Sequence, residues 1–129
     1  MKKLLLMFAL LFSTAMYSSP VRAEWTRVIE NENGTIFYVD LERIRKHDGY
    51  VYYWQLADNL KPWDEFFSST LYIQGDCKLF RLKTLSFSSH KKPMGEGGAA
   101  KTDNTPDKDW FYPPPESAAE TVLKLVCSQ

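Results

Sequence analysis

The chain contains two cysteines, and their positions constrain its fold more than any other feature. Cys77 lies in a run, residues 76–87, that has the composition of a β-strand, and Cys127 ends an amphipathic segment near the C-terminus. Two cysteines allow only one disulfide, and in an oxidising compartment that bond would pin a terminal helix onto the strand. The loop-entropy relation gives it a stabilisation of about 4 kcal/mol. Two free thiols are the alternative.

The first 23 residues have the pattern of a secretory signal peptide, so we expect the protein to be exported. Lys2 and Lys3 precede an unbroken apolar run at residues 4–12, and Val21-Arg22-Ala23 offers a cleavage site. The apolar run is too short to span a bilayer, which takes about 20 residues. Cleavage after Ala15 and a retained anchor helix are the alternatives. No cysteine follows the apolar run at a cleavage position, so a lipoprotein signal is not expected.

The remaining residues, 24–129, are expected to form a single domain. The whole chain has 16 basic and 16 acidic residues, and loss of Lys2, Lys3 and Arg22 leaves the mature domain with a formal charge of −3. This charge argues against a nucleic-acid-binding protein, which needs a basic surface.

Turn signals divide the first part of the domain into short elements. Asn33-Gly34 predicts a hairpin between residues 25–30 and 35–39, because both turn positions tolerate a positive φ. Residues 40–44 are expected to form one helical turn capped by Asp40, and residues 46–49 a second turn.

Long β-prone runs follow. Residues 50–58 predict a strand with apolar residues on both faces, so one face should meet the core while the other is covered or exposed as an aromatic patch. Residues 59–67 are expected to be a loop, and residues 68–76 a strand that continues into residues 76–87. The apolar alternation changes parity within this stretch, which favours a β-bulge near Lys83 and Thr84; burial of both faces at that end is the alternative.

The amino-acid composition changes in the last third of the domain. Residues 88–109 are rich in Gly, Lys, Asp and Pro, which predicts a long mobile connection. Ser117 and Glu120 fit a capping box at the start of a helix. Apolar residues then recur at helical spacing on one face: Ala119, Val122, Leu123, Val126 and Cys127. A helix this short is marginal alone and needs packing and the disulfide.

Catalytic and metal-binding patterns are weak. His47 and His90 are the only histidines, and both lie among polar residues, which predicts solvated turns and not a Ser-His-Asp triad. A zinc site from both histidines and Asp48 lacks the usual ligand spacing. The acidic pair Asp64-Glu65 is expected in a solvated loop. We therefore expect no catalytic residue, no cofactor and no metal.

Two features indicate more than a solvated surface. Arg81, between Lys78 and Lys83, is expected to form a structural ion pair, with Asp40 or Glu120 as partner. Pro93-Met94-Gly95 is a candidate protein-contact loop, because Met94 is the only methionine after residue 23 and an adaptable side chain suits protein contact. The alternative is a tight turn with Met94 tucked over the sheet.

The chain resembles the surface-adhesin protein E family of small exported Gram-negative proteins over nearly all of residues 24–129. The resemblance rests on the order of these pieces: Trp25, Gly34-Thr35, Tyr38-Val39-Asp40-Leu41, Asp76-Cys77-Lys78, Arg81, Leu85-Ser86, Pro93-Met94-Gly95, Trp110, Pro113-Pro114 and Glu120-Thr121-Val122-Leu123-Lys124-Leu125-Val126-Cys127. It implies an α+β fold with about six antiparallel strands, a C-terminal helix and a Cys77–Cys127 bond. It also implies a non-enzymatic adhesin that contacts host extracellular-matrix or serum proteins.

Three functions follow as hypotheses. The first is an exported binding protein of adhesin type, either periplasmic or at the cell surface and in the medium. The second is a periplasmic inhibitor or accessory factor that acts on an enzyme by loop insertion. A small hydrolase is the third. Exposed strand edges would also allow a homodimer.

Overall fold

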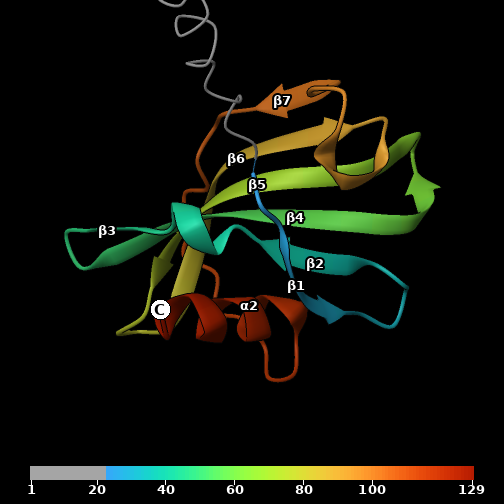
Figure 1. Cartoon of the computed structure of the whole chain (residues 1–129). Helices are drawn as coiled ribbons and strands as arrows, with labels where there is room; N and C mark the ends of the chain where they lie inside the picture. Colours follow the sequence, from blue (N-terminus) through green and yellow to red (C-terminus); the bar gives the residue numbers. More distant parts are fainter. Residues whose placement is uncertain (1–22) are drawn as a thin grey trace, which may run out of the picture.

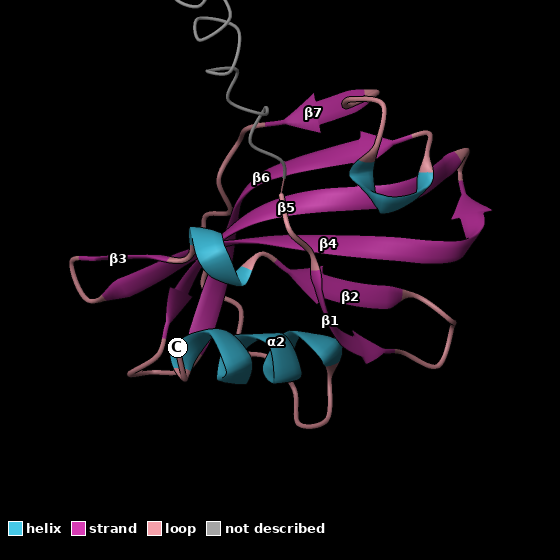
Figure 2. Ribbon diagram, in the orientation of Figure 1, coloured by secondary structure: helices cyan, strands magenta, loops and turns pink. Residues whose placement is uncertain are grey.

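The computed structural model describes residues 23–129, and the expected signal peptide at residues 1–23 therefore lies almost wholly outside the described residues. The described residues form a seven-stranded antiparallel sheet and a C-terminal helix (Figures 1 and 2). The strand order is β1-β2-β4-β5-β6-β7, and β3 pairs with the start of β4. The strands are β1 (Thr26–Glu30), β2 (Ile36–Val39), β3 (Arg45–His47), β4 (Tyr50–Trp63), β5 (Phe66–Asp76), β6 (Arg81–His90) and β7 (Lys101–Asp103), and the helix is α2 (Ala118–Cys127). The predicted α+β architecture is confirmed.

The predicted hairpin turn joins β1 to β2. The side-chain oxygen Oδ1 of Asn31 accepts hydrogen bonds from the amides of Asn33 and Thr35, each 3.0 Å away. Gly34 has a φ of 82°, a conformation that glycine adopts without steric cost. The hairpin therefore lies where the sequence predicted it, but only Gly34, and not Asn33, takes a positive φ.

A single turn of 3-10 helix, η1 (Leu41–Arg43), separates β2 from β3 and confirms the turn expected there. Asp40 caps it, because its Oδ1 accepts a hydrogen bond from the Glu42 amide at 3.2 Å. The turn predicted at residues 46–49 is only partly right: residues 45–47 are strand β3, and Asp48 and Gly49, both with positive φ, make the turn into β4.

The loop predicted at residues 59–67 is wrong, because β4 runs on to Trp63 and β5 begins at Phe66. Asp58 pairs with Ser68, and Trp63 pairs with Phe66, so residues 59–62 lie opposite Phe67 alone. This wide bulge accommodates Pro62, which cannot donate to a regular ladder.

The strand predicted at residues 76–87 is interrupted, because residues 77–80 form the turn between β5 and β6. Asp76 holds this turn with its Oδ1, which accepts hydrogen bonds from the amides of Lys78 and Leu79 at 3.1 and 3.2 Å. The predicted bulge is confirmed: Tyr72 pairs with Ser86 and Ile73 with Thr84, which leaves Leu85 as the extra residue.

The connection predicted at residues 88–109 is more ordered than its composition indicates. β6 extends to His90, a short 3-10 turn η2 (Pro93–Gly95) follows, and β7 pairs with β6. Further along, Phe111 and Leu82 exchange two backbone hydrogen bonds of 2.8 Å. Residues 101–111 therefore follow the outer edge of β6, and β1 and β7 are the end strands of the sheet.

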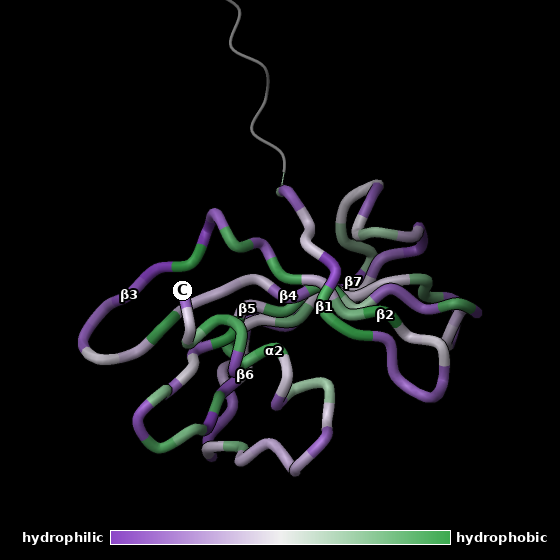
Figure 3. The backbone as a smooth tube through the Cα atoms, turned by 60° about the horizontal axis from the view of Figure 1, so that its bottom comes forward, coloured by the Kyte–Doolittle hydropathy of each residue, from purple (hydrophilic) through white to green (hydrophobic). Residues whose placement is uncertain are grey.

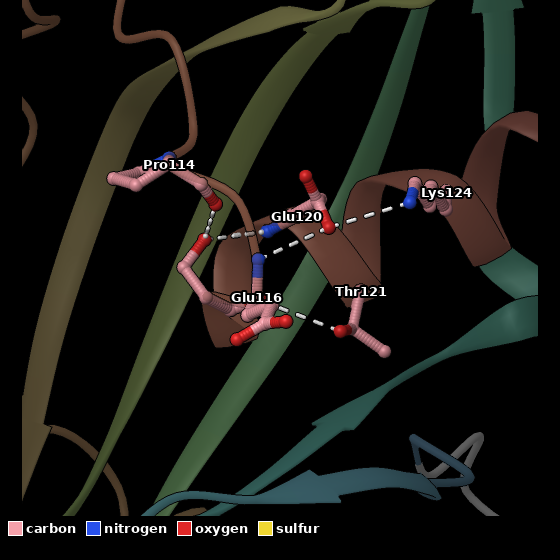
Figure 4. A network of polar contacts seen from close by, with 6 residues as sticks. Pro114, Glu116, Glu120, Thr121 and Lys124 are labelled. Carbon is pink, nitrogen blue, oxygen red and sulfur yellow. Dashed lines mark hydrogen bonds and ion pairs between the residues drawn. The ribbon is translucent and has the colours of Figure 1, made fainter.

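The predicted start of the helix is confirmed at Ser117 (Figure 4). Its Oγ accepts a hydrogen bond from the Glu120 amide at 3.1 Å and donates one to the carbonyl oxygen of Pro114 at 2.7 Å. The Glu120 carboxylate accepts from the Glu116 amide and from the Lys124 ammonium, both at 3.3 Å. These hydrogen bonds therefore stabilise the N-terminal end of the helix in addition to its packing against the core.

The core lies between one face of the sheet and the apolar stripe of α2. Val122, Leu123 and Val126 are fully buried, and Ala119 and Cys127 pack beside them, as predicted. The sheet contributes Val39, Val51, Tyr53, Ile73 and Leu82. Figure 3 shows hydrophobic segments of β1, β2 and α2 near the centre of the fold. The predicted Cys77–Cys127 disulfide is present and joins the end of β5 to the end of the helix.

Candidate binding surface

The sheet face opposite the helix carries a row of aromatic side chains. In β4, Val51 and Tyr53 point into the core, so the alternate residues Tyr52 and Trp54 point to the other side. Tyr72 of β5 lies between them, with ring centroids 6.2 Å from Tyr52 and 4.7 Å from Trp54. We call Tyr52, Trp54, Tyr72 and the neighbouring Trp110 the aromatic face. The patch anticipated on one side of residues 50–58 is therefore present, and its side chains are half-buried.

Trp110 extends the aromatic face toward β6, and two cationic side chains lie over its ring. The guanidinium carbon of Arg81 lies 4.3 Å from the centroid of the Trp110 ring, and the Lys83 ammonium lies 4.7 Å away. Tyr50 packs on the same indole with a centroid distance of 5.5 Å. Cations over an indole are attracted to its negative face, so this corner combines positive charge with apolar surface.

The partner of Arg81 is Asp76, and both predicted partners, Asp40 and Glu120, were wrong. The Arg81 Nε donates to Asp76 Oδ2 at 2.9 Å. Burial alone would raise the pKa of Asp76, but the hydrogen bonds from Arg81, Leu79 and Lys78 outweigh it and lower that pKa. The carboxylate is therefore charged at neutral pH and offsets the charge of Arg81, which leaves Lys83 as the uncompensated cation of this corner.

The candidate contact loop Pro93-Met94-Gly95 forms η2 and lies against the aromatic face at its far end. The Met94 amide donates to Asp58 Oδ1, and the Gly95 amide donates to Ser68 Oγ, both at 2.8 Å. Met94 is half-buried with a φ of 59°. This geometry matches the tight-turn alternative, and a role of the loop in partner contact stays a prediction.

The N-terminal segment also crosses this face. Trp25 lines a small hollow of about 160 Å³ together with Trp54 and Thr70, and Asp40 and Arg43 close it. Asp40 is 1% exposed, and its Oδ2 lies 3.3 Å from the Arg43 Nε. Asp40 thus pairs within its own helical turn, which explains why it is not available to Arg81.

A second exposed apolar site lies at the end of the β4–β5 hairpin. Trp63 is 78% exposed and Leu60 is 76% exposed, the largest values among the exposed large hydrophobic residues of the described chain. The sequence analysis placed both in a solvated loop. The missed signal was the apolar pair Leu60 and Trp63 beside Lys61, Pro62 and Asp64, because neighbouring exposed apolar side chains mark a candidate interaction site.

The two histidines differ. His47 is exposed, as predicted, and contacts the carboxylate of Asp48 at 3.1 Å. The prediction of a solvated turn is wrong for His90, which is 6% exposed and bonded to Thr70 Oγ1 at 2.9 Å and to the Gly98 carbonyl oxygen at 2.8 Å. Because a carbonyl only accepts, Nδ1 donates to Gly98, and in the neutral imidazole Nε2 then accepts from Thr70. His90 therefore fixes the 91–100 segment to the sheet.

Residues 23–129 contain no group of three or more His, Cys, Asp or Glu side chains arranged to hold a metal ion. Within the same residues, no helix combines the length and the apolar character that a membrane crossing demands.

The fold and its surfaces define a small antiparallel-sheet protein with a disulfide-tethered helix and a half-buried aromatic face on the other side of the sheet. The sequence profile of surface-adhesin protein E matches residues 25–128, and the chain belongs to this family. It is an adhesin-like protein of a family that is exported or displayed at the surface.

Solved structures show the same fold. The chain is 17% identical to Haemophilus influenzae protein E in crystal form II, with a TM-score of 0.61 over 86% of this chain and 92% of that chain. Its selenomethionine form gives 17% identity and a TM-score of 0.63 over 87% and 92%. Protein E from non-typeable Haemophilus influenzae gives 17% identity and a TM-score of 0.60 over 86% and 80%. No curated protein matches the chain.

Proposed function

We propose that this chain is an exported, non-catalytic binding protein that contacts host extracellular-matrix or serum proteins through its aromatic face. The observation that carries the proposal is the half-buried row of Tyr52, Trp54 and Tyr72 on the side of the sheet that the helix leaves open. Aromatic residues dominate the binding energy of protein interfaces because they bury a large area with few rotatable bonds. Lys83, beside Trp110, adds a cation that favours a partner surface with negative charge.

Export is part of this proposal. Residues 1–23 have the features of a signal peptide, and we infer that residues 24–129 are released as one folded domain. An oxidising compartment would then form the Cys77–Cys127 bond. N-terminal sequencing of the protein from the cell envelope should begin at Glu24, whereas a chain that still starts at Met1 would contradict processing.

Solid-phase binding of residues 24–129 to a panel of matrix and serum proteins tests the function. We expect saturable binding to at least one of them, and loss of a central aromatic anchor, Tyr72→Ala, to weaken it by ~30-fold, about 2 kcal/mol. Lys83→Glu should weaken the same binding, whereas the charge reversal Lys124→Glu on the helix, which also breaks the Lys124–Glu120 ion pair, should not. Binding that is equally sensitive to both reversals would contradict the choice of face.

A second candidate function rests on the β4–β5 hairpin. Its end exposes Trp63 and Leu60, a shape that would suit insertion into the cleft of an enzyme by a periplasmic inhibitor or accessory factor. Cell fractionation separates the two functions: adhesion needs protein at the surface or in the medium, and a purely periplasmic location favours the inhibitor. A small hydrolase remains a third hypothesis, and activity in a broad hydrolase screen would contradict the non-catalytic proposal.

A further inference from the structure

We propose that the ends of the β1–β2 and β4–β5 hairpins together form a binding site for an acidic sugar. In this site a pyranose ring stacks on Trp63 and its carboxylate pairs with Lys61. The inference goes beyond the proposed function, because a free oligosaccharide would bind here whether or not a host protein binds the aromatic face. The site is an open hollow of about 620 Å³, within the range of small-molecule sites. Its lining combines amide, hydroxyl, ammonium and apolar side chains: Asn33, Thr35, Asn59, Leu60, Lys61, Pro62, Trp63 and Ser69.

Two contacts hold the hairpin ends together, so the hollow is a built feature of the fold. Thr35 Oγ1 donates a hydrogen bond to Asn59 Oδ1 at 3.1 Å. Leu60 covers Gly34 so closely that a Cβ on Gly34 would lie 3.2 Å from Leu60 Cδ2. Figure 1 shows both hairpin ends at the same end of the sheet, on the right. The bulge at residues 59–62 turns the chain outward and forms one wall of the hollow.

The indole of Trp63 supplies the stacking surface. It is 78% exposed, and within residues 23–129 it makes no stacking contact with another aromatic ring or with a cation. The axial C–H bonds of a pyranose carry partial positive charge and are attracted to the negative face of an aromatic ring. An exposed indole beside polar groups therefore fits a sugar, which has both C–H and hydroxyl groups, better than it fits a purely apolar ligand.

The polar lining supplies what a sugar requires around that ring. The Thr35–Asn59 bond is the only side-chain hydrogen bond among the lining residues in the described part of the chain. Asn33, Ser69 and the amide nitrogen of Asn59 thus keep donors and acceptors for sugar hydroxyl groups. Lys61 forms no ion pair with any described residue. An unpaired ammonium beside a stacking surface selects a carboxylate over a hydroxyl, because charge-assisted hydrogen bonds are the stronger ones.

Nuclear magnetic resonance titration of the ¹⁵N-labelled mature protein tests the site. The probes are 3′-sialyllactose, whose sialic acid residue carries a carboxylate on a pyranose ring, and lactose, which lacks that residue. We expect saturable shifts of the backbone amides of Asn59, Leu60, Lys61 and Trp63 with sialyllactose, and binding of lactose weaker by ~10-fold, the effect of about 1.4 kcal/mol. Trp63→Ala should abolish the sialyllactose shifts, and Lys61→Met should bring sialyllactose down to the affinity of lactose.

A matched control is Leu79→Ala, which removes another exposed apolar side chain at the opposite end of β5 and should leave the titration unchanged. Thermal unfolding should show all three variants folded, because the side chains of Lys61, Trp63 and Leu79 are exposed. Absence of saturable shifts with either sugar would overturn the proposal, as would shifts that survive Trp63→Ala. Equal affinity for lactose and sialyllactose would overturn the assignment of an acidic sugar.

Discussion

Cys77, in the turn after β5, is bonded to Cys127, the last residue of α2, so the helix is covalently tied to the sheet at its C-terminal end. At the other end, Ser117 caps the helix by accepting a hydrogen bond from the Glu120 amide. The same hydroxyl donates a hydrogen bond to the carbonyl oxygen of Pro114, in the chain that leads into the helix. The helix is thereby confined to one face of the sheet and does not cover the aromatic face on the other side.

The disulfide is expected to contribute a large share of the stability. The bond closes a loop between residues 50 apart in sequence, for which the loop-entropy relation gives about 4 kcal/mol. The double variant Cys77→Ser with Cys127→Ser should lose an amount of this order in urea unfolding followed by circular dichroism. The wild type under reducing conditions is the control and should lose the same amount. A double variant as stable as the oxidised protein would contradict the role assigned to the bond.

The Arg81–Asp76 pair is expected to make stability depend on pH. The pKa of Asp76 is lowered in the folded protein, so the pair stabilises the fold above the carboxyl's unfolded pKa, about 4, and this contribution is lost as the pH falls through the lower folded value. Arg81→Met should therefore lower the Tm at pH 7, and the difference from the wild type should shrink below about pH 4. A Tm at pH 7 unchanged by Arg81→Met would show that the pair does not stabilise the fold.

Tyr53 carries an unpaired hydroxyl in the core. The residue is fully buried, its hydroxyl finds no hydrogen-bond partner among the described residues, and burial raises its pKa. An unsatisfied buried hydroxyl costs about 1–3 kcal/mol, so Tyr53→Phe should raise the free energy of unfolding by about 1 kcal/mol. Tyr52→Phe is the control, because its hydroxyl accepts a hydrogen bond from Gln74 and its loss should not stabilise. A lower free energy of unfolding for Tyr53→Phe than for the wild type would show that the Tyr53 hydroxyl forms a hydrogen bond in the folded protein.

Gly75 sets the distance between β5 and α2. A Cβ at this position would lie 2.9 Å from both Leu123 Cδ1 and Val51 Cγ2. Gly75→Ala should therefore cost about 1–3 kcal/mol through overpacking, measured by chemical denaturation. In a Leu123→Ala background the same substitution should cost less, since one of the two clashing groups is gone. Equal costs in both backgrounds would exclude the contact with the helix as the cause.

The sequence predicted those parts of the fold whose signals are local. The Asn33-Gly34 hairpin, the Asp40 cap and the Ser117 cap all depend on residues close in sequence, and each was found where predicted. The bulge near Thr84 followed from a change in apolar parity. The disulfide followed from there being only two cysteines.

The errors arose where side-chain hydrogen bonds and strand pairing, and not composition or periodicity, decide the structure. The turn at residues 77–80 contains no Gly, Pro or Asn, and it forms because Asp76 bonds its amides and Phe80 takes a φ of 53°. Residues 88–109 resemble a free connection in composition, but His90 and pairing with β6 hold them to the sheet. Arg81 pairs with Asp76 at the end of the adjacent strand β5, five positions away, and not with Asp40 or Glu120.

The site was less predictable than the fold. Alternation in residues 50–58 indicated an aromatic patch, but the position of Trp110 on Arg81 and Lys83 depends on the path of the last third of the chain. The hollow beside Trp63 needs two hairpin ends that are far apart in sequence, which no local pattern reports.

Hydrogen–deuterium exchange of the mature protein, alone and bound to the matrix or serum protein that the solid-phase panel identifies, tests the aromatic face most directly. We expect protection of β4 and β5 around Tyr52 and Tyr72 and of the segment at Trp110, with exchange in α2 unchanged. Protection confined to α2, with the aromatic face exchanging as in the free protein, would contradict the account.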